Sequence, residues 1–423
     1  MSSYKAYSLF LVGAIILPFN SQRFVMNLST VRLRKHEAKR IRMGHLWIYS
    51  NEIDNKATPI KSFTQGELVL VEDSNGKSLG IGYINPNNLL AIRIITRDYK
   101  INVDRSLFVH KLNIALSLRK RIFDKPFYRA VYGESDGLPG LIVDRFGEHL
   151  VVQITTAGME QQKANIIDAL CKVFKPESIL LRNDCNPRKV ERLDADIEQA
   201  FGVTPQSILI EENNAQFMIH PHTGQKTGWF YDHRESRQQI AKYVQGKRVL
   251  DVFSYIGAFG IQMAMAGAED VHCIDISGKA LDELQKNAEL NGVTDKIACI
   301  EGDAFSAMSE LREAGEKFDV VIVDPPAFIK KKKDQKPGLR AYRKVNEAAM
   351  RLLNKDGILL SASCSMHLKV EELQDGLLAG SRHLDKTLQI IEQCHQGQDH
   401  PIHPAIPETR YIKGFISRVL SAS

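Results

Sequence analysis

The chain has 423 residues, of which 43% are hydrophobic and 25% are charged, a composition typical of a globular protein with full hydrophobic cores. At about 150 residues per domain, this length predicts two or three domains. The composition excludes a disordered tail, a collagen-like chain and a polytopic membrane protein. The net charge of +6 is compatible with a polyanionic partner, but it is also ordinary for enzymes that act on small molecules.

The first 25 residues stand apart from the rest of the chain. Leu9 to Leu17 is an unbroken apolar run, too short for the roughly 20 residues that span a bilayer. It is either the apolar region of a signal peptide or a stretch upstream of a true start at Met26. No A-x-A-like cleavage site follows it, which favours the start at Met26.

The cysteines are scattered and form no C-x-x-C pair; they are Cys171, Cys185, Cys273, Cys299, Cys364 and Cys394. This pattern is typical of reduced thiols in the cytosol and not of a disulfide framework or a zinc site. We therefore predict a cytoplasmic protein with no metal site and no membrane partner.

The stretch from about Val31 to Thr96 is predicted to be rich in β-strands. ELVLVED and SLGIGYI flank a Ser-Asn-Gly turn at 74–76 and predict a hairpin, and LLAIRIIT predicts a further strand. Small barrels of this kind often bind nucleic acid. A basic cluster opens the segment: Arg32, Arg34, Lys35, Lys39, Arg40 and Arg42. Whether this cluster binds RNA or is only a solvated surface stays open here.

A compact α+β unit is predicted next. Apolar residues at helical spacing predict a helix over Val103–Phe123. The stretch 132–154 predicts a turn followed by strands. A helix near Glu160–Val173 and strands near 178–182 and 216–220 complete the unit, which ends at about Pro221.

From Lys247 onward, strands and helices alternate. Strands are predicted over 248–253, 271–276, 296–303, 317–326 and 357–365, and near 388–393 and 411–420. Helices are predicted after Gly257 and over 278–291, 341–353 and 368–380. Apolar strands that alternate with helices indicate an α/β fold with a mostly parallel sheet covered on both faces.

Acidic residues end four consecutive strands of this predicted sheet: Asp251, Asp275, Asp303 and Asp324. Ligands of such sheets bind beyond the carboxyl ends of the strands. A single terminal acid is often only a helix cap, but four in a row predict a nucleotide site. The next strand ends at Cys364, which is expected on the same rim as Asp324 and is therefore a candidate nucleophile. Asp324-Pro325-Pro326 predicts a rigid loop suited to a planar base.

The chain resembles the bacterial large-subunit ribosomal RNA cytosine-5 methyltransferases, which have an N-terminal PUA domain, a small central domain and a Rossmann-like S-adenosylmethionine domain. The resemblance runs from about residue 30 to the C-terminus. It rests on GHLWIYSNEI (44–53), GESDGLPGLIVDRFG (133–147), KTGWFYDHRESR (226–237), VLDVFSYIGAFG (249–260), FDVVIVDPPAF (318–328), SCS (363–365) and YIKGF (411–415). It implies an unmatched extension at 1–28, a PUA-like RNA-binding domain at 29–105, a central domain at 106–221 and the methyltransferase domain at 222–423.

The resemblance also implies S-adenosylmethionine as cofactor and 23S rRNA as partner. The turn with Asp251, Phe253, Tyr255 and Gly257 would cradle the methionine end, Asp275 would hold the ribose, and Asp303 with Ala304 would hold the adenine. Cys364 would attack C6 of the target cytosine, and Asp324 would hydrogen-bond N3. The covalent step is needed because C5 is a poor nucleophile until a thiolate adds at C6.

Two departures and two alternatives accompany this interpretation. Pro326 stands where the larger group of RNA cytosine-5 methyltransferases has a second Cys, and His233 stands where relatives tend to have Gln. A guanine-N7 methyltransferase would need no nucleophile, so Cys364 disfavours it, and a non-catalytic RNA-binding assembly protein would not need the row of acids. The modified nucleotide, the base that removes the C5 proton and the oligomeric state, including a homodimer, stay open.

The basic run Lys330–Lys333 with Lys336 is expected to contact RNA phosphates.

Overall fold

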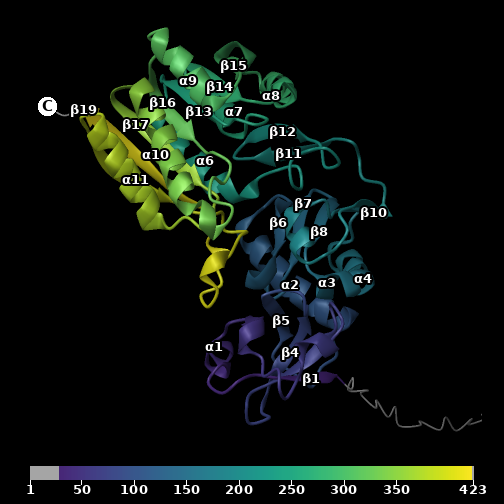
Figure 1. Ribbon diagram of the computed structural model, residues 1–423. Helices are drawn as coiled ribbons and strands as arrows, with labels where there is room; N and C mark the ends of the chain where they lie inside the picture. Colours follow the sequence, from purple (N-terminus) through teal and green to yellow (C-terminus); the bar gives the residue numbers. More distant parts are fainter. Residues whose placement is uncertain (1–27, 422–423) are drawn as a thin grey trace, which may run out of the picture.

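The computed structural model describes residues 28–421 and contains three large sheets that follow one another along the molecule (Figure 1). The predictions for Leu9–Leu17 and for a start at Met26 lie outside these residues. Within them, no helix is both long and apolar enough to cross a membrane. The six cysteines are all free.

The N-terminal domain is a five-stranded sheet in the order β1-β3-β4-β5-β2. Its elements are β1 (Ser29–Arg32), α1 (Ala38–Arg42), β2 (Trp47–Tyr49), η1 (Ser50–Glu52), η2 (Ile60–Ser62), β3 (Leu68–Glu72), β4 (Ser78–Ile84) and β5 (Leu90–Thr96). The antiparallel pairing of β3 with β4 confirms the predicted hairpin. Half of the basic cluster is paired inside the domain, because Arg32, Arg40 and Arg42 form ion pairs with Glu72, Glu52 and Asp73.

The central domain is a second five-stranded sheet, in the order β10-β9-β8-β7-β6. Its elements are α2 (Arg105–Ile122), β6 (Phe127–Tyr132), η3 (Gly133–Asp136), β7 (Leu141–Phe146), β8 (His149–Ile154), α3 (Ala157–Gln161), α4 (Lys163–Phe174), β9 (Ser178–Arg182), α5 (Asn186–Val190) and β10 (Ile197–Gly202). The expected helix α2 is present and is capped by the Asp104 carboxylate. The single helix expected near 160–173 is two helices that meet at Gln162, and β6 and β10 were not anticipated.

The C-terminal domain has a seven-stranded sheet in the order β15-β14-β13-β16-β17-β19-β18, in which only the last two strands are antiparallel to their neighbours. Its strands are β13 (Arg248–Val252), β14 (Asp270–Asp275), β15 (Ile297–Glu301), β16 (Phe318–Val323), β17 (Leu353–Ser363), β18 (Lys386–Cys394) and β19 (Lys413–Ser421). Its helices are η4 (Tyr231–His233), α6 (Arg234–Ile240), η5 (Ala241–Tyr243), α7 (Ala258–Met265), α8 (Gly278–Leu290), η6 (Thr294–Lys296), α9 (Ala304–Glu313), η7 (Lys332–Asp334), α10 (Gln335–Leu352), α11 (Val370–His383) and η8 (Pro407–Thr409). The predicted, mostly parallel α/β architecture is confirmed.

Each buried strand of this sheet faces two hydrophobic cores. In β16, Val320 and Ile322 pack with α7 and α8, while Val321 and Val323 pack with α9, α10 and α11. Because successive side chains of a strand point to opposite faces, a strand buried on both faces has an unbroken apolar sequence. The hairpin β11 (Ile208–Glu212) and β12 (Ala215–Ile219) packs with the α7 and α8 side of the sheet. The domain boundaries given above remain predictions.

The N-terminal and central domains share one packed and hydrogen-bonded boundary. Tyr83 of β4 is buried in the core of the central domain, and a Cβ at Gly158 would lie 2.0 Å from its ring. The carboxylate of Glu191, after α5, is 3% exposed and accepts hydrogen bonds from Asn85, Asn88 and Arg93 of the N-terminal domain at 2.8–2.9 Å. A single buried carboxylate therefore holds three groups of the neighbouring domain.

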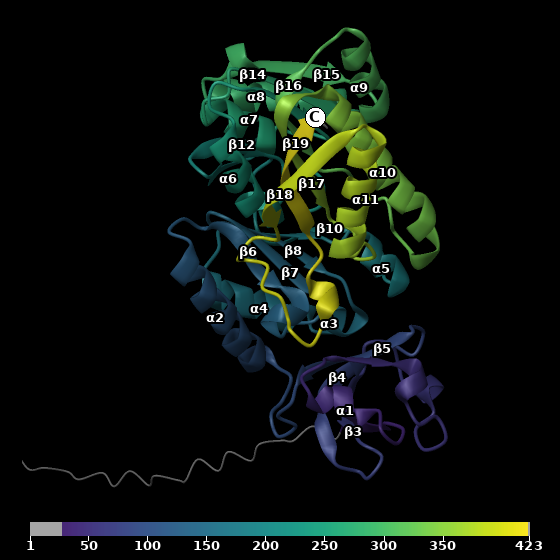
Figure 2. The same ribbon diagram turned by 90° about the vertical axis from the view of Figure 1, so that its left-hand side faces the viewer.

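The connection between β18 and β19, residues 395–412, extends from the C-terminal domain over the central sheet to the N-terminal domain (Figure 2). Its Ile406 is fully buried in the core of the N-terminal domain. Its Asp399 accepts a hydrogen bond from the backbone N of Arg129 in β6 at 2.8 Å. This one segment therefore contacts all three domains.

We expect replacement of Glu191 by Ala to lower the free energy of unfolding by about 3–5 kcal/mol, because it leaves the buried Arg93 and two amides without their acceptor. Chemical denaturation followed by far-UV circular dichroism measures the change. Glu198→Ala is the matched control, because Glu198 forms only an exposed ion pair with Lys163 and its loss should cost no more than about 1 kcal/mol. Equal denaturation midpoints for the two variants would show that Glu191 does not hold the boundary.

Candidate active site

The carboxyl ends of five parallel strands lie at one edge of the C-terminal sheet. β13 pairs in parallel with β14 and β16, β14 with β15, and β16 with β17. Four predicted groups therefore follow neighbouring strands at the same edge: Asp275, Asp303, Asp324 and Cys364. Asp251 lies one residue before the end of β13 and is buried.

The turn after β13 has an unusual backbone. Phe253, Tyr255 and Gly257 all have positive φ, at 70°, 51° and 87°. The buried carboxylate of Asp251 accepts a hydrogen bond from the backbone N of Gly260 at 2.9 Å, which ties the start of α7 to the strand. Burial raises the pKa of Asp251 to about 7, with the carboxylates of Asp324 and Asp275 adding to the shift and the hydrogen bond from Gly260 opposing it. Asp251 therefore stabilises the turn through a buried hydrogen bond to the start of α7.

The carboxylate of Asp275 is held by two backbone groups. The amide of Tyr255 donates to Oδ2 at 2.8 Å and that of Ser277 donates to Oδ1 at 2.9 Å. The side chain of the next residue, Ile276, is 73% exposed. Asp303 caps α9 through Oδ1, Ala304 is buried, and the following Phe305 is 38% exposed.

Ile276 and Phe305 were missed by reasoning from the sequence. Each is a large apolar residue that closely follows an acid at the end of a strand. This position is the sequence feature that could have identified them as candidate site residues. Exposed apolar side chains next to well-oriented carboxylates suit a ligand with an apolar face and polar edges.

Asp324, after β16, is surrounded by charged groups. His233 Nε2 lies 3.4 Å from Asp324 Oδ2. Burial and the charge of Asp232 raise the pKa of Asp324, and His233 opposes the shift. Although burial disfavours its ionised form, Asp232 has a pKa held well below its usual range by Lys226, His233 and His400 and by the Tyr411 hydroxyl, which donates to it at 2.6 Å.

The two serines of the Ser-Cys-Ser motif anchor the Cys364 loop. Ser363 Oγ donates to the Tyr342 hydroxyl of α10 at 2.7 Å, and Ser365 Oγ donates to the carbonyl of Ile329 at 2.7 Å. The Lys413 ammonium donates to the carbonyl of Ser365 at 2.7 Å, and its burial lowers its pKa to about 8. Lys413 belongs to the recognised YIKGF motif, but its contact with this loop was not anticipated.

The Cys364 side chain is half-buried between these anchors. Burial and the charge of Asp324 raise the pKa of the Cys364 thiol to about 11, with Lys226 opposing. The resting group at neutral pH is therefore a thiol, and a reaction at sulfur needs a proton acceptor. The charges of Asp324, Lys226 and Asp232 all influence the Cys364 thiol. Residues from three separate segments of the sequence, 226–232, 324 and 364, therefore lie near one another.

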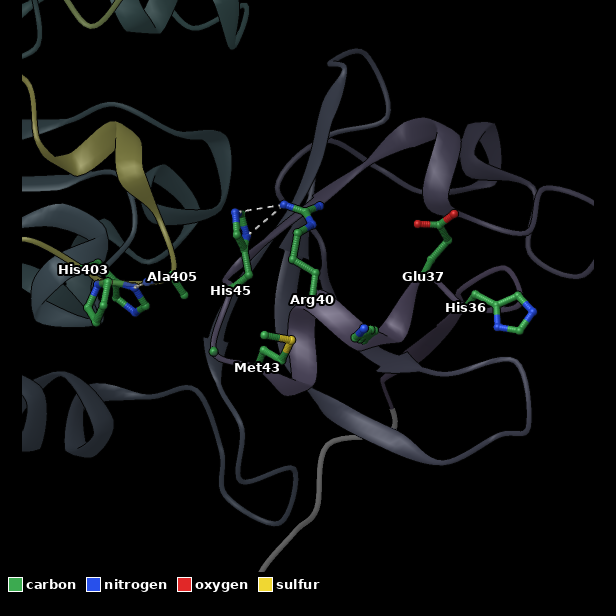
Figure 3. Close-up of a pocket in the computed structure, with 10 residues that line it drawn as sticks. His36, Glu37, Arg40, Met43, His45, His403 and Ala405 are labelled. Carbon is green, nitrogen blue, oxygen red and sulfur yellow. Dashed lines mark hydrogen bonds between the residues drawn. The ribbon is translucent and has the colours of Figure 1, made fainter. Parts of the chain in front are cut away.

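A separate cavity of about 670 Å³ lies between the N-terminal domain and the 395–412 connection. Its basic lining groups include Lys39, Arg40 and His45 from the N-terminal domain and His403 from the connection. In Figure 3, Arg40 points toward His45, and Arg40 Nη1 lies 2.9 Å from His45 Nε2. Burial and the charge of Arg40 lower the pKa of His45, so its ring is neutral at pH 7.

Comparison with known proteins agrees with this architecture. Residues 31–97 match the model of a PUA-like domain, and residues 188–401 match that of an S-adenosylmethionine-dependent methyltransferase. Two proteins named Ribosomal RNA large subunit methyltransferase I, from Erwinia tasmaniensis and Aliivibrio fischeri, are each 36% identical over 92% of this chain and over 100% and 99% of their own.

The fold is also found among solved structures. A methyltransferase complexed with SAH has a TM-score of 0.80, and an S-adenosylmethionine-dependent methyltransferase from Streptococcus mutans has one of 0.78. Each is 18% identical in sequence to this protein, and each match covers 92% of this chain and 100% of the solved chain. The chain has a PUA-like domain and a row of acids at the strand ends. It belongs to the S-adenosylmethionine-dependent methyltransferase family, in the group that contains the proteins from Erwinia tasmaniensis and Aliivibrio fischeri.

Proposed function

We propose that this protein transfers the methyl group of S-adenosylmethionine to C5 of a cytosine in large-subunit ribosomal RNA through a covalent adduct with Cys364. The names of its relatives, which refer to large-subunit ribosomal RNA, support the substrate class. The observation that carries the chemistry is the anchored Cys364 thiol on the same rim as Asp324. Methylation of guanine N7 would need no such thiol, because N7 is already nucleophilic.

In this proposal, the cofactor lies along the rim from β13 to β15. Asp275, whose carboxylate is oriented by two backbone amides, holds the ribose hydroxyls. Asp303 and the backbone of Ala304 hold the adenine edge, and Ile276 and Phe305 contact the faces of its ring. The turn from Phe253 to Gly257 faces the methionine end. The cofactor supplies an activated methyl group on a sulfonium, a positive charge that suits an edge rich in carboxylates.

The target cytosine enters beyond β16 and β17. Cys364 Sγ adds to C6, and Asp324 hydrogen-bonds the protonated N3, so that C5 becomes nucleophilic. Methyl transfer to C5, which would break the bond between the methyl group and the sulfonium, comes next. Loss of the C5 proton and expulsion of the thiolate would then complete the reaction. The base must be unstacked to reach this rim, as in other enzymes that modify bases. Pro325, directly after Asp324, is buried.

Two surfaces are suited to bind the RNA. Lys330, Lys331, Lys332 and Lys333 are all exposed in the loop between β16 and α10, next to the rim. The cavity at the N-terminal domain adds two cations of that domain, Lys39 and Arg40. Such contacts neutralise phosphates and position the RNA without reading its sequence.

We expect Cys364→Ala to abolish methylation, because no other group in the proposal can form the adduct. Bisulfite sequencing of 23S rRNA from cells that lack the gene and carry either the wild-type or the variant copy measures the product, and calorimetry should show unchanged affinity for S-adenosylmethionine. Cys171→Ala, on α4 of the central domain, is the matched control and should remain active. Normal methylation by the Cys364 variant would refute the covalent mechanism.

We expect Asp275→Ala to weaken S-adenosylmethionine binding by roughly ten-fold or more, because charge-assisted hydrogen bonds to ribose hydroxyls contribute roughly 1.5–3 kcal/mol. Titration calorimetry measures this change directly. Asp270→Ala removes an acid from the opposite end of the same strand and should leave the affinity intact. An unchanged dissociation constant for the Asp275 variant would exclude it from the cofactor site.

We expect simultaneous replacement of Lys331, Lys332 and Lys333 by Ala to weaken RNA binding and to reduce its dependence on salt. Each lost phosphate contact lowers the slope of log affinity against log salt by roughly 0.7–0.9. Fluorescence anisotropy with an rRNA fragment over a range of KCl concentrations measures the slope. The control replaces three exposed lysines of the central domain, Lys172, Lys175 and Lys189. Equal slopes for wild type and the loop variant would show that the run faces only solvent.

A further inference from the structure

A buried histidine lies beside Asp324 without a hydrogen-bond partner. The side chain of His233, in η4, is 4% exposed, and its ring is tilted against that of Phe259 in α7 with centroids 5.9 Å apart. Neither ring nitrogen makes a hydrogen bond to any residue from 28 to 421. Buried polar groups in folded proteins are nearly always hydrogen-bonded. Nε2 lies 3.4 Å from Asp324 Oδ2, whereas Nδ1 has no polar partner among these residues.

Charges of both signs surround this pair. Titratable and charged groups come from the elements that surround the pair: Lys226, Asp232, Arg237, Asp251, His400 and Tyr411. Both cations have other partners, because Lys226 Nζ lies over the Phe230 ring and Arg237 Nε donates to Glu212 at 2.6 Å. When ionised, Asp324, whose Oδ2 lies 3.4 Å from Nε2, can stabilise an imidazolium at His233.

The proposed reaction includes a proton transfer from the Cys364 thiol to N3 of the cytosine, and the His233–Asp324 pair could carry this proton. The Cys364 thiol must lose its proton before it adds to C6, and N3 of cytosine must gain one during the addition. Asp324 interacts with both Cys364 and His233. A glutamine in place of His233 could orient the Asp324 carboxylate but could not take up a proton at neutral pH.

We propose that His233 is a positioning residue that acts through Asp324 and holds the proton of the Cys364 thiol until N3 of the target cytosine receives it. This inference rests on the proposed function. The thiol proton passes to the His233–Asp324 pair and leaves a thiolate and an imidazolium. The S–C6 bond then forms, the C5=C6 electron pair becomes the C4=C5 bond, and the C4=N3 π pair moves to N3. N3 takes the proton from Asp324, which receives it from His233, so the pair returns to its starting state.

The first test needs neither RNA nor cofactor. Nuclear magnetic resonance of the full chain labelled with ¹⁵N-histidine follows the titration of His233, whose signals are identified by their absence in His233→Gln. We expect Asp324→Asn to shift the ¹⁵N signals of His233 toward those of the neutral ring, because the imidazolium loses the carboxylate that lies 3.4 Å from Nε2. His272, which lies 3.1 Å from Asp270 at the opposite end of the sheet, is the internal control and should not respond. Signals of a neutral His233 ring throughout, or signals that do not respond to Asp324→Asn, would overturn the pairing.

The second test measures single-turnover methyl transfer to unmodified 23S rRNA as a function of pH. In the wild type, the rate should fall on acidification, because a His233–Asp324 pair that already holds its proton cannot accept another. In His233→Gln, the carboxylate alone is a weaker base, so the plateau rate should be about ten-fold lower or more. The acidic limb should also move to lower pH, and KM should stay constant. His272→Gln, the matched control, should retain the wild-type profile.

Two results would overturn this role of His233. An unchanged pH profile in His233→Gln would show that His233 takes no part in transferring the thiol proton. A lower plateau rate with an unmoved acidic limb would show that the ring contributes only packing contacts. Failure of the proposed function is seen separately. In that case the wild type itself adds no methyl to C5, while the titration of His233 still reports whether it is paired with Asp324.

Discussion

The parallel pairing of β13 to β17 is the constraint on which the rest of the structure depends. Parallel strands require long crossovers, and here α7, α8, α9 and α10 supply them and cover both faces of the sheet. All the turns that follow these strands are thereby gathered at one edge. Residues more than a hundred positions apart, such as Asp251 and Cys364, reach the same rim without any long irregular segment.

This gathering has an electrostatic consequence. Asp232, Asp251 and Asp324 are close enough to influence one another, and burial alone would push all three toward the neutral form. Their pKa values separate instead, because Asp232 has cations and a hydroxyl nearby, whereas Asp251 has one backbone amide and two like charges. Neighbouring carboxyls with different protonation states are a common feature of enzyme active sites. An edge of this kind favours a cationic ligand and can also supply a proton.

The sequence was sufficient for the parts of the fold that depend on local pattern. Unbroken apolar strands and the helices between them predicted the C-terminal sheet, and the acids at strand ends predicted its functional edge. It was insufficient where tertiary contacts decide. In β10, exposed residues alternate with half-buried ones, so it lacks an apolar signature. The roles of His233 and Lys413 depend on contacts with residues 91 and 48 positions away, Asp324 and Ser365.

The 395–412 connection shows why the three domains act as one body. Ile406 is buried in the N-terminal core, Asp399 binds β6 of the central sheet, and Tyr411 donates to Asp232 at the rim. Residue 413 then begins β19, and its ammonium holds the Cys364 loop. A displacement of the N-terminal domain would therefore have to break contacts that continue into the active site. In the function proposed above, RNA bound to a surface of that domain would therefore present its bases to Cys364 in a restricted orientation.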